Sequence, residues 1–133
     1  MFVSTIDNYI KELKEDTVVN ELNLKEKALM LPGIKAKWVS RLINHKNVIT
    51  GLEREKKKIL KNIIPKVRES LPVKLSENVI RDSAESTKEI HDLNLKIEEE
   101  KNIVDFLERT EKIASSFSFD ISNIIKVVQL ETL

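Results

Sequence analysis

Five basic side chains recur along one stretch of the chain at a spacing that suits contact with phosphate groups. We call them the basic face: Arg54, Lys57, Lys58, Lys61 and Arg68. On a helix, at about 100° per residue, they fall within roughly a third of the circumference and extend over about 21 Å. Only Glu53 and Glu55 are acidic nearby, so the cluster is poorly neutralised within its own helix. Cations in such an array bind phosphates and release counterions, which favours a nucleic-acid partner held by its backbone.

The distribution of charge leaves a second interpretation open. The 133 residues carry a net charge of only +1, yet residues 35–68 hold 11 basic and 2 acidic groups, and residues 69–112 hold 7 and 12. The basic face could therefore be solvated, or pair with an acidic helix around Glu98, Glu99 and Glu100. In that case the protein would be a coiled-coil structural or adaptor protein.

No arrangement of residues in the sequence predicts catalysis. His45 and His91 lie on different predicted elements, without a carboxylate cluster at ligand spacing. The run from Glu98 to Glu100 is consecutive, so on a helix its carboxylates point about 100° apart. The chain has no cysteine, and its two glycines do not form a phosphate-binding loop. We therefore expect no enzyme activity, no metal site and no cofactor.

The composition predicts an all-α protein of one domain, residues 1–133. Hydrophobic residues make up 41%, charged residues 34% and aromatic residues only 5%, which is typical of long helices. The scarcity of glycine argues against hairpins and against all-β folds. Neither a signal peptide nor an apolar run of about 18 residues is visible, so we expect a soluble, cytoplasmic protein without membrane contact.

The periodicity of apolar residues divides the first half of the chain into short helices and one long helix. Amphipathic stretches at 5–15 and 24–31 predict short N-terminal helices within residues 1–33, the second ending before Pro32 and Gly33. A stripe from Trp38 to Val67 predicts a basic helix over 34–71, with the Trp38 side chain in the core. Pro65 predicts a kink or break near residue 64, and Pro72 a firmer end.

A second long, acidic helix is predicted over 76–115, antiparallel to the first, which gives a helical hairpin. Its apolar seam has heptad spacing and consists of Ile90, Leu93, Ile97, Val104 and Leu107. The conformation of residues 76–89 stays open. Ser76 is a suitable cap for a helix that starts there, whereas Ser86 and Thr87 fit the capping box of a later start.

The last segment, residues 117–133, is predicted to be a separate assembly helix capped by Asp120. It is apolar on more than one face and has few charges, so a short hairpin offers little surface to cover it. We therefore expect self-association through the following residues: Phe117, Phe119, Ile121, Ile124, Ile125 and Val128.

Two parts of the sequence resemble the UvsY family of recombination mediators from T-even-type phages. The N-terminal part of the match comprises Leu13-Lys14-Glu15-Asp16, Leu24, Lys37-Trp38, Arg41, Glu53-x-Glu55-Lys56-Lys57 and Leu60-Lys61. The C-terminal part comprises Leu95-Lys96-Ile97, Leu107, the region of Phe119 and Ile125-Lys126-x-x-Gln129. Together they cover about two thirds of the chain, whereas residues 66–92 show no correspondence.

The resemblance implies a non-enzymatic, all-helical protein that forms a ring-shaped homo-oligomer through its C-terminal region and binds single-stranded DNA. It also implies that the protein helps a RecA-like recombinase displace a single-strand-binding protein, in the host cytoplasm if a phage encodes it. The family's basic motif is Lys-x-Arg, and its lysine falls on Lys61. Its arginine position falls on Ile63, so the neighbouring cations of the basic face would have to replace that arginine.

Overall fold

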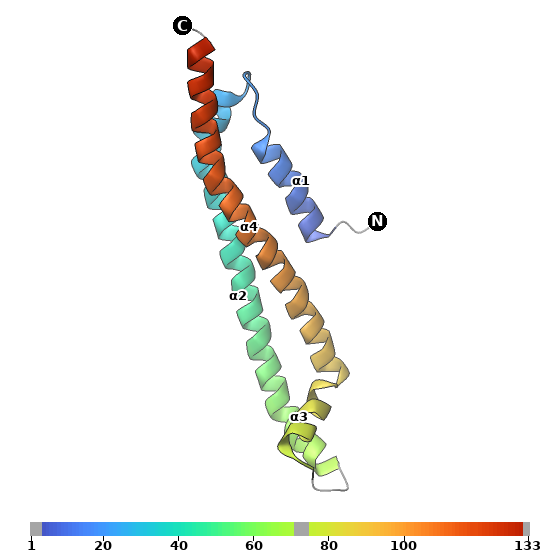
Figure 1. Ribbon diagram of the computed structural model, residues 1–133. Helices are drawn as coiled ribbons and strands as arrows, with labels where there is room; N and C mark the ends of the chain where they lie inside the picture. The colour runs from blue at the N-terminus through green and yellow to red at the C-terminus, as the bar shows by residue number, and fades with distance from the viewer. Residues whose placement is uncertain (1–3, 71–74, 132–133) are drawn as a thin grey trace. The chain divides into compact units, whose positions relative to one another are not determined.

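The computed structural model describes residues 4–70 and 75–131, and these residues form helices without any strand. The helices are α1 (Thr5–Thr17), α2 (Leu24–Ser70), α3 (Glu77–Glu85) and α4 (Lys88–Glu131), as Figure 1 shows. The predicted all-α class is confirmed. Pro72 and the last two residues of the chain lie outside the described residues. None of the described helices is apolar over a length that could cross a membrane.

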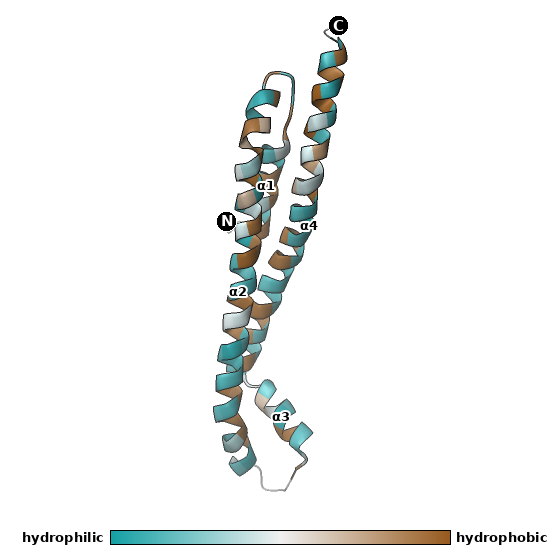
Figure 2. Cartoon of the chain, turned by 90° about the vertical axis from the view of Figure 1, so that its left-hand side faces the viewer, coloured by the Kyte–Doolittle hydropathy of each residue, from teal (hydrophilic) through white to brown (hydrophobic). Residues whose placement is uncertain are grey.

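The chain divides into two compact units. Unit 1 consists of Met1–Asn44 and Ile103–Leu133, and unit 2 of His45–Asn102. In unit 1, α1 and the first part of α2 pack against the last part of α4 around a core of Ile34, Trp38, Leu42, Ile103 and Leu107. Figure 2 shows apolar residues along the facing sides of these helices. Trp38 is completely buried, which confirms its predicted place in the core.

In unit 2, the second part of α2 packs against α3 and the first part of α4. Its core consists of Leu60, Ala84, Ile90 and Leu93, with Ile63 and Val67 packed against it. The segment that the sequence left open is α3, and Ser76 caps it by accepting a hydrogen bond from the amide of Val79. The hydroxyl of Thr87 instead donates back to the carbonyl of Ala84, just before α4 begins.

The predicted boundary at Pro32 and Gly33 is wrong, because α2 is one helix from Leu24 to Ser70. Neither glycine of the chain has a positive φ. Contacts with the α1 segment hold α2 on both sides of Pro32: Lys27 Nζ donates to the carbonyl of Glu15, and Trp38 is buried beyond it. These tertiary contacts offset the local cost of a proline, about 3 kcal/mol inside a helix.

One further predicted boundary is wrong, and of the kink or break predicted near Pro65 the break is excluded. The α2 helix continues through Pro65 without a break, and Val67 beyond it still packs against the core of unit 2. The α4 helix continues from Lys88 to Glu131, so there is no separate assembly helix and Asp120 is an interior helix residue rather than a cap. The reason is the stripe of Ala114, Phe117 and Ile121, which is buried at spacings of three and four.

Candidate nucleic-acid interface

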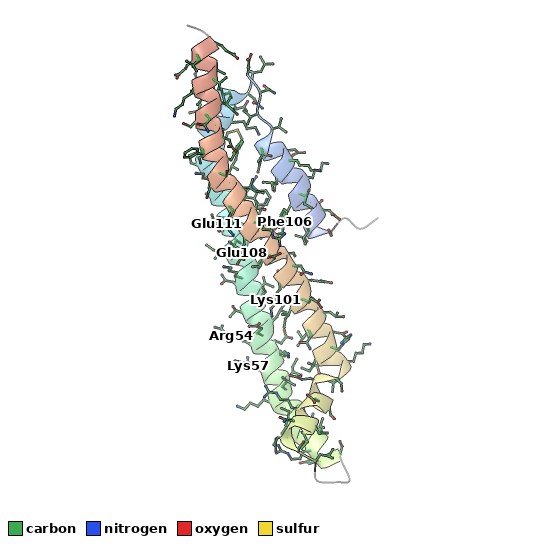
Figure 3. The ribbon with its side chains drawn as sticks, viewed as in Figure 1. Arg54, Lys57, Lys101, Phe106, Glu108 and Glu111 are labelled. Atoms are coloured by element: carbon green, nitrogen blue, oxygen red, sulfur yellow. The ribbon has the colours of Figure 1, made fainter. Side chains whose placement is uncertain are left out.

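All five residues of the basic face are exposed side chains of α2 in unit 2. Within the described ranges 4–70 and 75–131, no carboxylate forms an ion pair with Arg54, Lys57, Lys58 or Lys61. Figure 3 shows Arg54 and Lys57 on the side of α2 that points away from α4. Since Leu60 on the other side is buried, helical phase keeps the basic face in solvent.

Arg68, the last member of the basic face, is engaged. Its guanidinium donates to both carboxylate oxygens of Glu77 at 2.7 Å, which links the end of α2 to the first turn of α3. Both side chains are more than half exposed, at 52% and 78%. An exposed pair of this kind contributes about 0–1 kcal/mol, so a phosphate could compete for Arg68 at small cost.

The acidic stretch of α4 does not neutralise the basic face among the residues that the structure describes. Glu98 and Glu99 are exposed, and Glu100 lies 2.6 Å from His45 through Nδ1 and Oε2. Lys101 of α4 pairs with Glu53 of α2 at 4.0 Å. The adaptor interpretation partly depended on ion pairs between the basic face and the acidic residues Glu98 to Glu100. Such pairs are not observed among the described residues.

His45 of α2 contacts Glu100 of α4, an interaction that the sequence pattern did not predict. Its side chain is 16% exposed and contacts Glu100, which fills one position of the apolar seam of α4. His91 is exposed on another turn of α4. Across the described residues, no group of three or more histidine, aspartate or glutamate side chains could hold a metal ion.

A second polar group, missed by the sequence analysis, lies in unit 1. We call it the aromatic-ion cluster: Tyr9, Glu12, Asp16, Lys37, Trp38 and Arg41. Asp16 accepts hydrogen bonds from Lys37 Nζ at 2.6 Å and from the indole of Trp38 at 3.0 Å. A buried indole N–H without a partner would be costly, so this bond orients Trp38 and fixes α1 on α2.

The guanidinium of Arg41 completes the aromatic-ion cluster. It donates to both carboxylate oxygens of Glu12 and lies 4.8 Å from the ring centroids of both Tyr9 and Trp38. The hydrogen bond from Arg41 lowers the pKa of Glu12, and the same bond raises the pKa of Arg41. Because Trp38 is buried in this contact, it is unsuited to stacking on a base.

The predicted assembly residues of α4 have different environments. Phe117 and Ile121 are buried inside unit 1, at 7% and 3% exposure, so the expectation that one copy lacks the surface to cover them is wrong. Ile125 and Val128 are half-buried. Phe119 is 74% exposed and Ile124 is 37% exposed. Only the exposed members are free for contact with another molecule.

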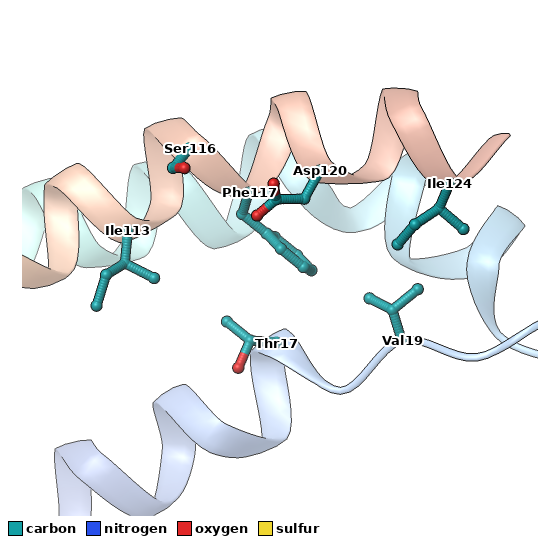
Figure 4. Close-up of a pocket in the computed structure, with 7 residues that line it drawn as sticks. All are labelled: Thr17, Val19, Ile113, Ser116, Phe117, Asp120 and Ile124. Carbon is teal, nitrogen blue, oxygen red and sulfur yellow. The ribbon is translucent and has the colours of Figure 1, made fainter. Parts of the chain in front are cut away.

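A groove lies where the end of α1 and the residues after it face α4, within unit 1 (Figure 4). Its volume is about 540 Å³. We call it the C-terminal groove, and its lining residues are Thr17, Val19, Ile113, Ser116, Phe117, Asp120 and Ile124. Most of this lining is apolar, and Asp120 is its one charged residue.

The helices and the exposed basic face define the class: an all-α protein with a row of exposed cations on one helix. The chain belongs to the UvsY family, because the family model described as "Recombination, repair and ssDNA binding protein UvsY" matches residues 12–132. The predicted resemblance is thus confirmed. No curated protein matches the chain in sequence.

Solved structures with this fold include crystal structures of the recombination mediator protein UvsY of bacteriophage T4. Lattice type IV has a TM-score of 0.82 at 18% identity and covers 96% of this chain and 99% of that chain. Lattice type II has a TM-score of 0.78 at 16% identity and covers 98% and 100%, respectively. At these identities the structural comparison establishes the fold alone. Membership of the UvsY family is established by the match to the family model.

Proposed function

We propose that this protein binds single-stranded DNA through its basic face and acts as a recombination mediator. The observation that carries the proposal is the row of four exposed cations on α2, Arg54 to Lys61, without carboxylate partners in the described chain. Their side chains lie within about 11 Å along the helix axis, at 1.5 Å per residue. That spacing allows contacts to consecutive phosphates of one strand, and phosphate contacts carry no base information.

In the proposed mechanism, a homo-oligomer presents several basic faces to one strand. The first contact is weak, but every later contact is intramolecular and therefore occurs at high effective concentration. A ring of this kind could hold DNA while a RecA-like recombinase replaces a single-strand-binding protein on it. This role is supported by the family's description as recombination, repair and single-stranded-DNA-binding proteins.

The DNA contact is tested by the salt dependence of binding to a fluorescent single-stranded homopolymer. The double substitution Lys57→Ala with Lys61→Ala should weaken binding, and the slope of log affinity against log salt should flatten by about 0.7 per lost phosphate contact. The matched control is Lys88→Ala with Lys112→Ala, two exposed lysines of α4 that remove the same charge. We expect the control to keep the wild-type slope.

Equal losses in the two double variants would show that overall charge, rather than the basic face, attracts DNA. A wild-type protein that does not bind single strands at low salt would favour the adaptor function instead. The mediator step has its own test, which is recombinase filament formation on DNA covered with a single-strand-binding protein. Wild-type protein should shorten the lag before filaments grow, and the variant Lys57→Ala with Lys61→Ala should not.

A further inference from the structure

The last cation of the basic face is tied to the first turn of α3 by Glu77. One nitrogen of the Arg68 guanidinium, Nη2, donates to both carboxylate oxygens of Glu77 at 2.7 Å. Both residues belong to unit 2, and both side chains are more than half exposed. A guanidinium binds the oxygens of a phosphate through the same N–H donors that it offers to a carboxylate. Glu77 and a DNA phosphate therefore compete for one cation.

The fold of unit 2 explains why Glu77 meets Arg68. Glu77 precedes the buried residues Ile80 and Ala84 by three and seven positions, so it shares the side of α3 that packs into the core of unit 2. Figure 1 shows α3 beside the end of α2. Ser76 caps α3 just before Glu77, and a carboxylate in the first turn suits the helix dipole. The cap and the core of α3, rather than the ion pair itself, thus determine where Glu77 lies.

Arg68 has the position of a fifth phosphate ligand. At about 100° per residue, it points within roughly 20° of Lys57 and Lys61 and within roughly 40° of Arg54. It lies on the same continuous helix, about 10 Å beyond Lys61 along the axis. A strand that follows the first four cations of the basic face therefore reaches Arg68 next.

We propose that Glu77 sets how strongly the protein binds single-stranded DNA, because its carboxylate holds Arg68 until a phosphate displaces it. Glu77 is a positioning residue, since it acts through Arg68 and does not itself contact DNA. The inference rests on the proposed DNA binding by the basic face and adds a residue that lowers the affinity. An exposed ion pair is weak, so the cost in affinity is at most about fivefold per chain. Such a residue suits a protein that must also release its strand, since the ion pair forms again as the phosphate leaves.

The test is a double-mutant cycle on Glu77 and Arg68, measured as the salt dependence of binding to a fluorescent deoxythymidine homopolymer. Glu77→Gln removes the charge, keeps the shape of the side chain and leaves the Ser76 cap in place. It should raise the affinity at low salt by about two- to fivefold. The slope of log affinity against log salt should steepen by up to about 0.7 for each chain on the strand. Arg68→Ala should lose more affinity in the Glu77→Gln background than in the wild-type background.

The matched control is Glu69→Gln, which removes the same charge from an exposed residue next to Arg68 in the sequence. On the helix Glu69 points about 100° away from Arg68, so this variant should keep the wild-type slope. In the Arg68→Ala background, Glu77→Gln should have no larger effect than Glu69→Gln has on the wild type. Circular dichroism should show unchanged helix content in every variant.

Equal gains from Glu77→Gln and Glu69→Gln would overturn the proposal, because net charge would then explain both. An equal loss from Arg68→Ala in the two backgrounds would do the same, since the two residues would then act independently. These outcomes differ from a failure of the proposed function. Wild-type protein that binds DNA through the basic face, with no response to Glu77→Gln, refutes this inference alone. Wild-type protein that binds no single strand at low salt refutes both.

Discussion

At the scale of single residues, the best-defined polar contacts lie away from the basic face, in the aromatic-ion cluster. The cations there, Lys37 and Arg41, are held by Asp16 and Glu12, whereas the first four cations of the basic face have no such partner among residues 4–70 and 75–131. The same residue types thus fulfil two roles in one chain. Paired cations position α1 and Trp38, and unpaired cations are available to a ligand.

The contact between Glu12 and Arg41 makes the stability of unit 1 depend on pH. Because the hydrogen bond from Arg41 lowers the pKa of Glu12 in the folded state, the contribution is present above the ordinary glutamate pKa of about 4.3. It is lost as the pH falls through the lowered value. We expect the unfolding free energy to decline as acid is added below about pH 5 and Glu12→Gln to flatten that decline.

The control for this prediction is Glu111→Gln, an exposed glutamate of α4 in the same unit. Urea denaturation over a series of pH values measures the effect. A pH profile of Glu12→Gln that runs parallel to the wild-type profile would contradict the role assigned to this pair.

At the scale of elements, the long helix α2 continues through glycine residues, which disfavour helical structure. Gly33 and Gly51 lie inside α2 with no positive φ, and a Cβ atom added to either would meet no atom within 4 Å. Neither position therefore needs glycine for the fold. Each glycine instead costs helix stability, because it loses more backbone entropy than alanine on folding.

Gly33→Ala and Gly51→Ala should each stabilise the protein by about 0.5–1 kcal/mol. Urea denaturation should show a higher midpoint with an unchanged slope. The matched control is the reverse change, Ala36→Gly, at an exposed position of the same helix, which should lower stability by a similar amount. A lower midpoint for the alanine variants would contradict the prediction and would show that the fold requires glycine at these positions.

At the scale of the whole molecule, two cores stabilise the chain, and each contains segments of both long helices. Trp38 is fully buried in unit 1 and Ile90 is fully buried in unit 2. The basic face belongs to unit 2, and the aromatic-ion cluster belongs to unit 1. The two groups of charged side chains therefore depend on separate cores.

Large-to-small substitutions should reveal this separation. Trp38→Ala should cost about 3–5 kcal/mol and Ile90→Ala about 2–5 kcal/mol. In native-state hydrogen exchange, Trp38→Ala should reduce protection mainly in the amides of unit 1, and Ile90→Ala mainly in those of unit 2. A uniform loss of protection in both variants would show instead that the chain opens as one cooperative body.

The sequence by itself determined the properties that depend on period and composition. Apolar residues at spacings of three and four predicted the helices and placed Trp38 in a core, because a helix with one apolar stripe must bury that stripe. The same phase put the basic face in solvent, opposite the stripe. The sequence also determined the family resemblance, since the Lys37-Trp38 pair and its neighbours have the spacing of the UvsY family. Several of these residues contact one another in the aromatic-ion cluster.

Tertiary structure decided where the helices end and which charges and apolar residues are free. Pro32 and Pro65 are local stop signals of at most about 3 kcal/mol each, and burial of the residues beyond them outweighs that cost. The partners of Arg68 and Trp38, Glu77 and Asp16, lie 9 and 22 residues away in sequence, so no local pattern could identify them. Burial of Phe117 and Ile121 likewise depends on the fold of unit 1. Apolar periodicity shows which residues favour burial, but it does not show whether they are buried within the same chain or against a second copy.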